Sequence, residues 1–132
     1  MNHKLKKYLA TGFILTALAV AFGAFGAHGL KNVLSEHYLG VYETANKYHF
    51  IHSVGLIVTL YMTDKLGNER ACRFIFVLFI LGLVLFSGSL YMLSLADFLE
   101  LPGLKILGAV APIGGLSFIA AWLYAGILFL KR

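Results

Sequence analysis

The chain of 132 residues is 60% hydrophobic and only 13% charged, about half the charged fraction of an ordinary soluble domain. A soluble fold of this length cannot bury so much apolar surface, so the composition favours one integral membrane domain, residues 1–132, with the lipid bilayer as its partner. The net charge of +5 does not indicate a nucleic-acid partner, because the charges gather at the ends of apolar runs. The single cysteine, Cys72, excludes an internal disulfide.

The first apolar run covers residues 8–27 and follows three lysines. A basic start, an apolar run and small residues near its end also describe a signal peptide. The run is, however, about 20 residues long, which is enough to cross the hydrocarbon core. We therefore expect a retained transmembrane helix here.

The second apolar run ends before Asp64, and a full crossing places its helix at 43–63. Apolar residues continue upstream at helical spacing, and Ser35 is a suitable N-cap there. We therefore expect a short interfacial helix over 31–42, or else an outward extension of the second membrane helix.

The third predicted span covers 74–95, with Asn68 as the predicted N-cap of its helix. Pro102 marks a turn, and the last apolar run covers 104–130. The predicted fold class is therefore all-α. It is an antiparallel bundle of four transmembrane helices, with the short interfacial helix between the first two.

Lysine and arginine predict the orientation of the bundle, because they are enriched on the cytoplasmic side of membrane proteins. One side carries Lys4, Lys6, Lys7, Lys65, Arg70, Arg73, Lys131 and Arg132. The other side carries only Lys31, Lys47 and Lys105. The imbalance repeats at every crossing, so we expect both termini in the cytoplasm.

Small residues recur in the first and last predicted helices. They are Ala19, Gly23, Gly26 and Ala27 in the first helix, and Gly108, Ala111 and Gly115 in the last. Small residues let helix backbones approach closely in lipid. They indicate close packing within the chain or, as an alternative, the interface of a homo-oligomer.

Polar residues inside membrane spans are costly and are candidates for function. Matching depths along antiparallel helices predicts one cluster in the outer half of the bundle. Its members are His28, Asn46, His49, His52, Ser87, Tyr91 and Pro112. We expect His52 to lie inside the protein, with Ser87 or Tyr91 among its nearest polar neighbours.

Three kinds of chemistry are open to this cluster. His49 and His52, at i and i+3, can reach one metal ion, with His28 as a third ligand, but no HExxH motif supports a metal site. Histidine titrates near neutral pH, so a proton relay is a second possibility. The third is structural: the polar groups hydrogen-bond between helices and fix their register. We assign no metal and no cofactor.

Enzyme motifs are absent from the sequence. Ser87-Gly88-Ser89 lacks the G-x-S-x-G frame of a nucleophile elbow. A triad of Ser87, His52 and Glu43 fails, because Glu43 would lie about 13 Å from His52 along one helix. We therefore expect a protein that is not an enzyme.

Four strings taken together resemble the YgdD/YwdK family of small bacterial inner-membrane proteins of unknown function. The strings are Gly23-Ala24-Phe25-Gly26-Ala27-His28, Tyr48-His49-Phe50-Ile51-His52, Leu85-Phe86-Ser87-Gly88-Ser89-Leu90-Tyr91, and Pro112-Ile113-Gly114-Gly115 followed by Trp122. The resemblance covers nearly the whole chain and implies a multi-pass protein of the bacterial cytoplasmic membrane. It matches His28, His52, Ser87, Tyr91 and Pro112, whereas family members often carry glutamine at the position of His49. It brings no known activity.

Two functional hypotheses follow. The first is a non-enzymatic membrane protein, oligomeric, with a structural or envelope-maintenance role. The alternative is a small oligomeric channel or transporter for protons, metal ions or small solutes, with a pathway along His28, His52, Ser87 and Tyr91. The apolar inner halves of the first, third and fourth predicted helices argue against a complete pore.

Overall fold

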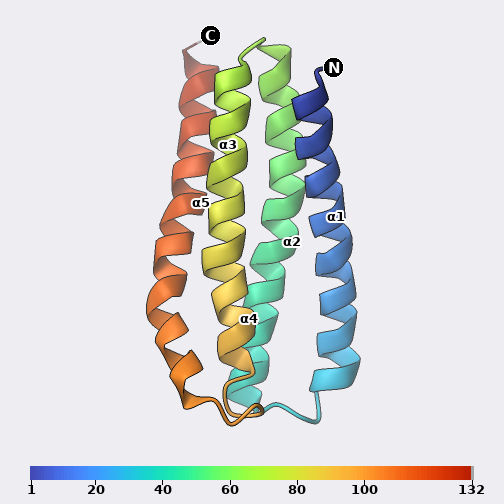
Figure 1. Cartoon of the computed structure of the whole chain (residues 1–132), viewed down its shortest axis with the longest axis vertical. Helices are drawn as coiled ribbons and strands as arrows, with labels where there is room; N and C mark the ends of the chain where they lie inside the picture. Colours follow the sequence, from blue (N-terminus) through green and yellow to red (C-terminus); the bar gives the residue numbers. More distant parts are fainter. Residues whose placement is uncertain (132) are drawn as a thin grey trace.

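The computed structural model describes residues 1–131, and its regular elements are all helical. In chain order they are α1 (His3–Phe25), η1 (Gly26–Leu30), α2 (Glu36–Lys65), α3 (Glu69–Gly82), η2 (Leu83–Gly88), α4 (Ser89–Ser94), η3 (Pro102–Ile106) and α5 (Leu107–Leu130). The segments η1 and η2 are π-helical and continue their neighbours, while η3 is a 3₁₀-helix that leads into α5. The described chain therefore forms four long antiparallel helices (Figure 1). Arg132, which the charge count includes, lies outside the described residues.

Both chain ends lie at the same end of the bundle, together with the turn between α2 and α3 (Figure 1). We call this the terminal end. The opposite end, which we call the loop end, holds the connections 31–35 and 95–101. In Figure 1, α2 lies between α1 and α3, and α5 lies on the far side of α3.

Three of the four long helices are long and apolar enough to cross a membrane. They are 3–30, 69–94 and 102–130. The helix α2 is of similar length, but its polar residues, among them Asn46, Lys47 and His49, lower its mean hydropathy. The sequence and the structure thus agree on an all-helical membrane protein.

The separate interfacial helix expected over 31–42 does not form. The Ser35 side chain accepts a hydrogen bond from the Tyr38 N–H at 3.3 Å, and this cap starts α2 at Glu36. No proline interrupts the chain from there to Lys65, so the first turns of α2 are the outward extension that was the alternative.

The turn between α2 and α3 follows from two residues with local preferences. Gly67 adopts a left-handed conformation, with φ of 64°, and its N–H donates to the Asp64 carbonyl at 2.8 Å. The Asn68 side chain then accepts from the Ala71 N–H at 3.0 Å, which confirms the predicted cap. This tight turn makes α2 and α3 antiparallel neighbours.

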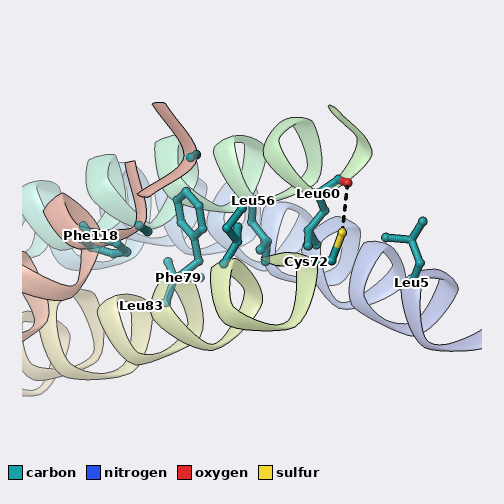
Figure 2. Close-up of a cluster of buried hydrophobic side chains, with 10 residues drawn as sticks. Leu5, Leu56, Leu60, Cys72, Phe79, Leu83 and Phe118 are labelled. Atoms are coloured by element: carbon teal, nitrogen blue, oxygen red, sulfur yellow. Dashed lines mark hydrogen bonds between the residues drawn. The ribbon is translucent and has the colours of Figure 1, made fainter. Parts of the chain in front are cut away.

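An apolar core fills the terminal half of the bundle (Figure 2). We use this name for the buried residues Leu5, Leu56, Leu60, Cys72, Ile75, Phe79, Leu83, Phe118, Ala121 and Ala125. Leu56, Leu60 and Phe79 have no exposed surface. Lipid is as apolar as these side chains, so close van der Waals packing, rather than the hydrophobic effect, stabilises their contact.

Glycines allow α5 to pack closely against α3 and η2. A Cβ added at Gly82 would overlap the Phe118 ring, and one added at Gly114 would overlap the backbone of η2. Gly23 of α1 lies against the Asn46 side chain of α2, and Gly26 of η1 lies against the Tyr42 side chain. These small residues are thus used for packing within the chain, and the homo-oligomer stays a prediction.

Candidate functional site: a polar seam between helices

One face of α2 carries three polar side chains toward α1 in the loop-end half of the bundle. Tyr42, Asn46 and His49 are spaced i, i+4 and i+7, so they share a face. The Tyr42 hydroxyl donates to the Phe22 carbonyl at 2.7 Å, and the Asn46 amide donates to the Ala19 carbonyl at 2.7 Å. Side chains of α2 thereby bond directly to the backbone of α1.

Tyr91 of α4 completes this arrangement. Its hydroxyl lies 3.0 Å from the Asn46 Nδ2 and 3.0 Å from the His49 Nδ1. The two amide hydrogens of Asn46 can serve Ala19 and Tyr91, and the Tyr91 hydroxyl hydrogen is then free to bond the His49 Nδ1. A neutral His49 with its proton on Nε2 satisfies every one of these bonds.

Aromatic side chains pack against the ring of Tyr91. Its ring packs edge to face against Phe22, with centroids 5.3 Å apart, and at 63° against Tyr42 at 5.1 Å. His49 is buried, with 6% of its surface exposed. We name Tyr42, Asn46, His49 and Tyr91 the polar seam. It joins α1, α2 and α4 and ends at backbone carbonyls.

His52 lies inside the protein, as expected, but outside the polar seam. Its Nδ1 donates to the Tyr48 carbonyl of its own helix at 2.8 Å, and its ring stacks on Phe118 of α5 with centroids 3.5 Å apart. Neither Ser87 nor Tyr91 is its hydrogen-bond partner. The position three residues after His49 is rotated toward α5, so its ring meets aromatic side chains instead.

The other predicted members of the cluster are dispersed. His28 and Pro112 are exposed, and His28 has no side-chain hydrogen bond within residues 1–131. Ser87 is 2% exposed, and its hydroxyl has no partner in the described part of the chain. It lies in the π-helical segment η2.

The arrangement offers little to a metal ion. Among residues 1–131, no group of three histidine, cysteine, aspartate or glutamate side chains is placed to hold one. The Nδ1 atoms of His49 and His52 are both engaged in hydrogen bonds, with different partners. Both histidine rings are thus held by hydrogen bonds to other groups of the protein.

A small groove opens beside the polar seam at the loop end. It has a volume of about 150 Å³ and is lined by Gly23, Gly26, Ala27, Tyr42, Glu43, Asn46 and Lys47. Sequence reasoning named Tyr42 only as an end of the interfacial helix and did not place it in the cluster. Its i, i+4, i+7 relation to Asn46 and His49 is the signal that would have found it.

Comparison with known proteins is consistent with this membrane architecture. The family described as "Protein of unknown function (DUF423)" matches residues 22–115. The chain belongs to this family. It is 39% identical over 127 residues to the UPF0382 membrane protein YwdK of Bacillus subtilis (strain 168), covering 96% of this chain and 98% of that protein. The resemblance to the YgdD/YwdK family is thus confirmed.

Other relatives of the chain are also described as UPF0382 membrane proteins. A UPF0382 membrane protein of Staphylococcus haemolyticus (strain JCSC1435) is 42% identical over 121 residues, covering 90% of this chain and 91% of that protein. One of Staphylococcus epidermidis (strain ATCC 12228 / FDA PCI 1200) is 40% identical over 129 residues, covering 96% and 98%. No solved structure matches the chain. All the polar seam side chains lie within the part that the family matches.

Proposed function

We propose that this DUF423 protein is a non-enzymatic protein of the bacterial cytoplasmic membrane with a structural role in the envelope. Four helices cross the bilayer, and both termini lie in the cytoplasm. The observation that carries this proposal is the polar seam. Its hydrogen bonds join helices, two of them from side chain to backbone and one from the Asn46 amide to the Tyr91 hydroxyl, and they stop halfway across the bundle. In lipid, such bonds fix helix register.

The surface of α2 supports the proposal that this helix crosses the membrane together with the three more apolar helices. Its polar residues in the middle of the bundle, among them His49, His52 and Ser53, are buried. From residue 50 to residue 62 its exposed face is mainly apolar and carries Phe50, Ile51, Val54, Val58 and Met62, whereas the exposed Glu43 and Lys47 lie nearer the loop end. A helix with this distribution exposes hydrocarbon to lipid and keeps polar groups within protein.

The shared terminal end supports the proposed orientation. Four crossings return the chain to the side where it began, and the N-terminus, the C-terminus and the α2–α3 turn lie together (Figure 1). Basic residues concentrate there, as expected of the cytoplasmic side. Labelling of single cysteines in a Cys72→Ser background tests this. Gly103→Cys should react with an impermeant maleimide in intact cells and Asn68→Cys should not, and the reverse would contradict the orientation.

The apolar core argues against a conducting path within one chain. Leu56, Leu60 and Phe79 fill the space between the polar seam and the terminal end without exposed surface (Figure 2). An ion or a proton crossing the bundle would have to pass these apolar side chains, and the buried hydroxyls beside them, Thr59 and Thr63, lie singly along α2 and bring no charge to the layer. Protein reconstituted into vesicles should therefore add no proton or ion flux over protein-free vesicles.

A second candidate is a small channel or transporter that uses His28, His52, Ser87 and Tyr91. The buried Ser87 hydroxyl favours transport. An unpaired polar group inside a membrane protein can bind a solute or a water molecule as its hydrogen-bond partner. The vesicle assay separates the two proposals. Flux that is lost in His52→Leu and Ser87→Ala, while both variants keep the wild-type melting temperature, would replace the structural role with transport.

A further inference from the structure

A cavity of about 180 Å³ opens at the terminal end of the bundle, away from the polar seam. It is lined by Asn2, Lys4, Leu5, Tyr8, Asp64, Glu69, Arg70, Cys72 and Arg73. A cavity of this volume has room for several waters or for a small charged group. Neither the polar seam nor the proposed structural role uses this cavity.

The charges around the cavity favour a ligand with one negative charge. Three cations, Lys4, Arg70 and Arg73, face two carboxylates, which leaves one net positive charge. Among residues 1–131, the one ion pair within 4 Å joins Lys105 and Asp97 at the loop end, so the three cations of the cavity are not in ion pairs.

The backbone adds to this positive field. The helices α1 and α3 both begin at the cavity, at His3 and Glu69, and helix N-termini favour anions. The Asn2 amide donates to the Glu69 carboxylate, so one of the two carboxylates already has a hydrogen-bond donor. Asp64 remains to accept a hydrogen bond from a ligand hydroxyl.

The floor of the cavity is apolar. Leu5 and Cys72 are 4% and 5% exposed and belong to the apolar core, at its end nearest the terminal end (Figure 2). The Tyr8 ring stacks on Phe76 with centroids 4.1 Å apart and forms one wall. A charged rim over an apolar floor at the end of a membrane bundle matches the boundary between lipid headgroups and acyl chains.

We propose that this cavity binds the phosphodiester headgroup of an anionic phospholipid of the phosphatidylglycerol type. The phosphate lies against Lys4, Arg70 and Arg73, and a headgroup hydroxyl donates to Asp64. Guanidinium groups suit phosphate because they bond it in a bidentate manner. The inference rests on the proposed placement of the terminal end at a membrane surface.

Native mass spectrometry of the full chain in neutral detergent tests the proposal. The protein is titrated with dioleoyl phosphatidylglycerol, with dioleoyl phosphatidylethanolamine, and with inorganic phosphate as a competitor. Phosphatidylglycerol should bind tightest, and millimolar phosphate should not displace it. Arg70→Gln/Arg73→Gln should weaken binding about tenfold or more, because each basic residue near a lipid surface contributes to the attraction.

Lys6→Gln/Lys7→Gln is the matched control, since it removes two charges from the same end but not from the cavity. It should weaken binding less than about twofold. Lys4→Gln, from the opposite wall, provides a second variant if the arginine pair fails to fold. Equal weakening in pair and control, or equal binding of phosphatidylethanolamine, would overturn the site. Displacement by phosphate would assign it to a soluble anion instead. None of these results depends on topology, so failure here leaves the four-span proposal standing.

Discussion

The two halves of α2 are held to their neighbours in different ways. In the loop-end half, Tyr42 and Asn46 bond to the backbone of α1, and Tyr91 of α4 joins the same network. In the terminal half, Leu56 and Leu60 pack in the apolar core with residues of α3 and α5. Hydrogen bonds determine the register of the loop-end half, and the close packing of apolar side chains determines that of the terminal half.

The difference shows what a membrane bundle needs where lipid supplies no hydrophobic drive between helices. The apolar core depends on close approach, so glycines lie beneath large rings in it and beside it: Gly82 beneath Phe118 of the core, and Gly55 beneath the neighbouring Trp122. The polar seam also has its glycine, since Gly23 lies beneath Asn46. Substitutions should therefore have different effects in the two halves, and those effects can be ranked.

The largest effect is expected at Gly114. An added Cβ would lie 2.6 Å from the Leu85 carbonyl carbon, and backbone cannot move aside as a side chain can. Gly114→Ala should lower the free energy of unfolding in detergent by about 3 kcal/mol. The neighbouring Gly115→Ala is the control, because its Cβ meets the Phe86 ring at an ordinary 3.5 Å. Equal melting temperatures for the two variants would mean that the close approach of α5 to η2 is not required.

The polar seam should respond next to the loss of Asn46. Asn46→Leu keeps the volume but removes the bonds to Ala19 and Tyr91. We expect a loss of about 1–2 kcal/mol, measured by the same unfolding assay. Thr44→Val is the control, since the Thr44 hydroxyl bonds only to Gly40 of its own helix, on an exposed face. A loss at Asn46 no greater than at Thr44 would contradict a stabilising seam.

The smallest effect is expected at His52. Its hydrogen bond goes to the Tyr48 carbonyl of the same helix, so His52→Leu leaves no partner on another helix unpaired. The loss should be below about 0.5 kcal/mol, whereas His49→Leu should cost about 1 kcal/mol, because it takes a partner from Tyr91. If His52→Leu proved the more harmful of the two, the boundary of the polar seam would be wrong.

Local features of the fold could be predicted from the sequence. Ser35 and Asn68 cap helices through their own side chains, so no distant contact is needed to recognise them. Depth matching correctly brought Asn46, His49 and Tyr91 together, because antiparallel helices of known ends fix depth. The position of these residues along the bundle axis could therefore be predicted from the sequence.

The rotation of each helix about its own axis could not be predicted from the sequence. His49 and His52 lie at similar depth, and only the packing of the whole bundle turns one toward Tyr91 and the other toward Phe118. The π-helical segment η2 adds to this, since a wider turn changes which residues after it share a face. Ser87 lies inside η2 and Tyr91 after it, so the two residues do not keep the angular relation that a regular α-helix would give them.

A double-mutant cycle between Asn46 and Tyr91 tests most directly whether the polar seam joins the helices. Asn46→Leu, Tyr91→Phe and the double variant are unfolded in the same detergent, and the coupling is the departure from additivity. The 3.0 Å contact between the Asn46 amide and the Tyr91 hydroxyl predicts a favourable coupling of about 1 kcal/mol. Purely additive losses, with no coupling beyond error, would show that the two side chains do not act together and would contradict the seam.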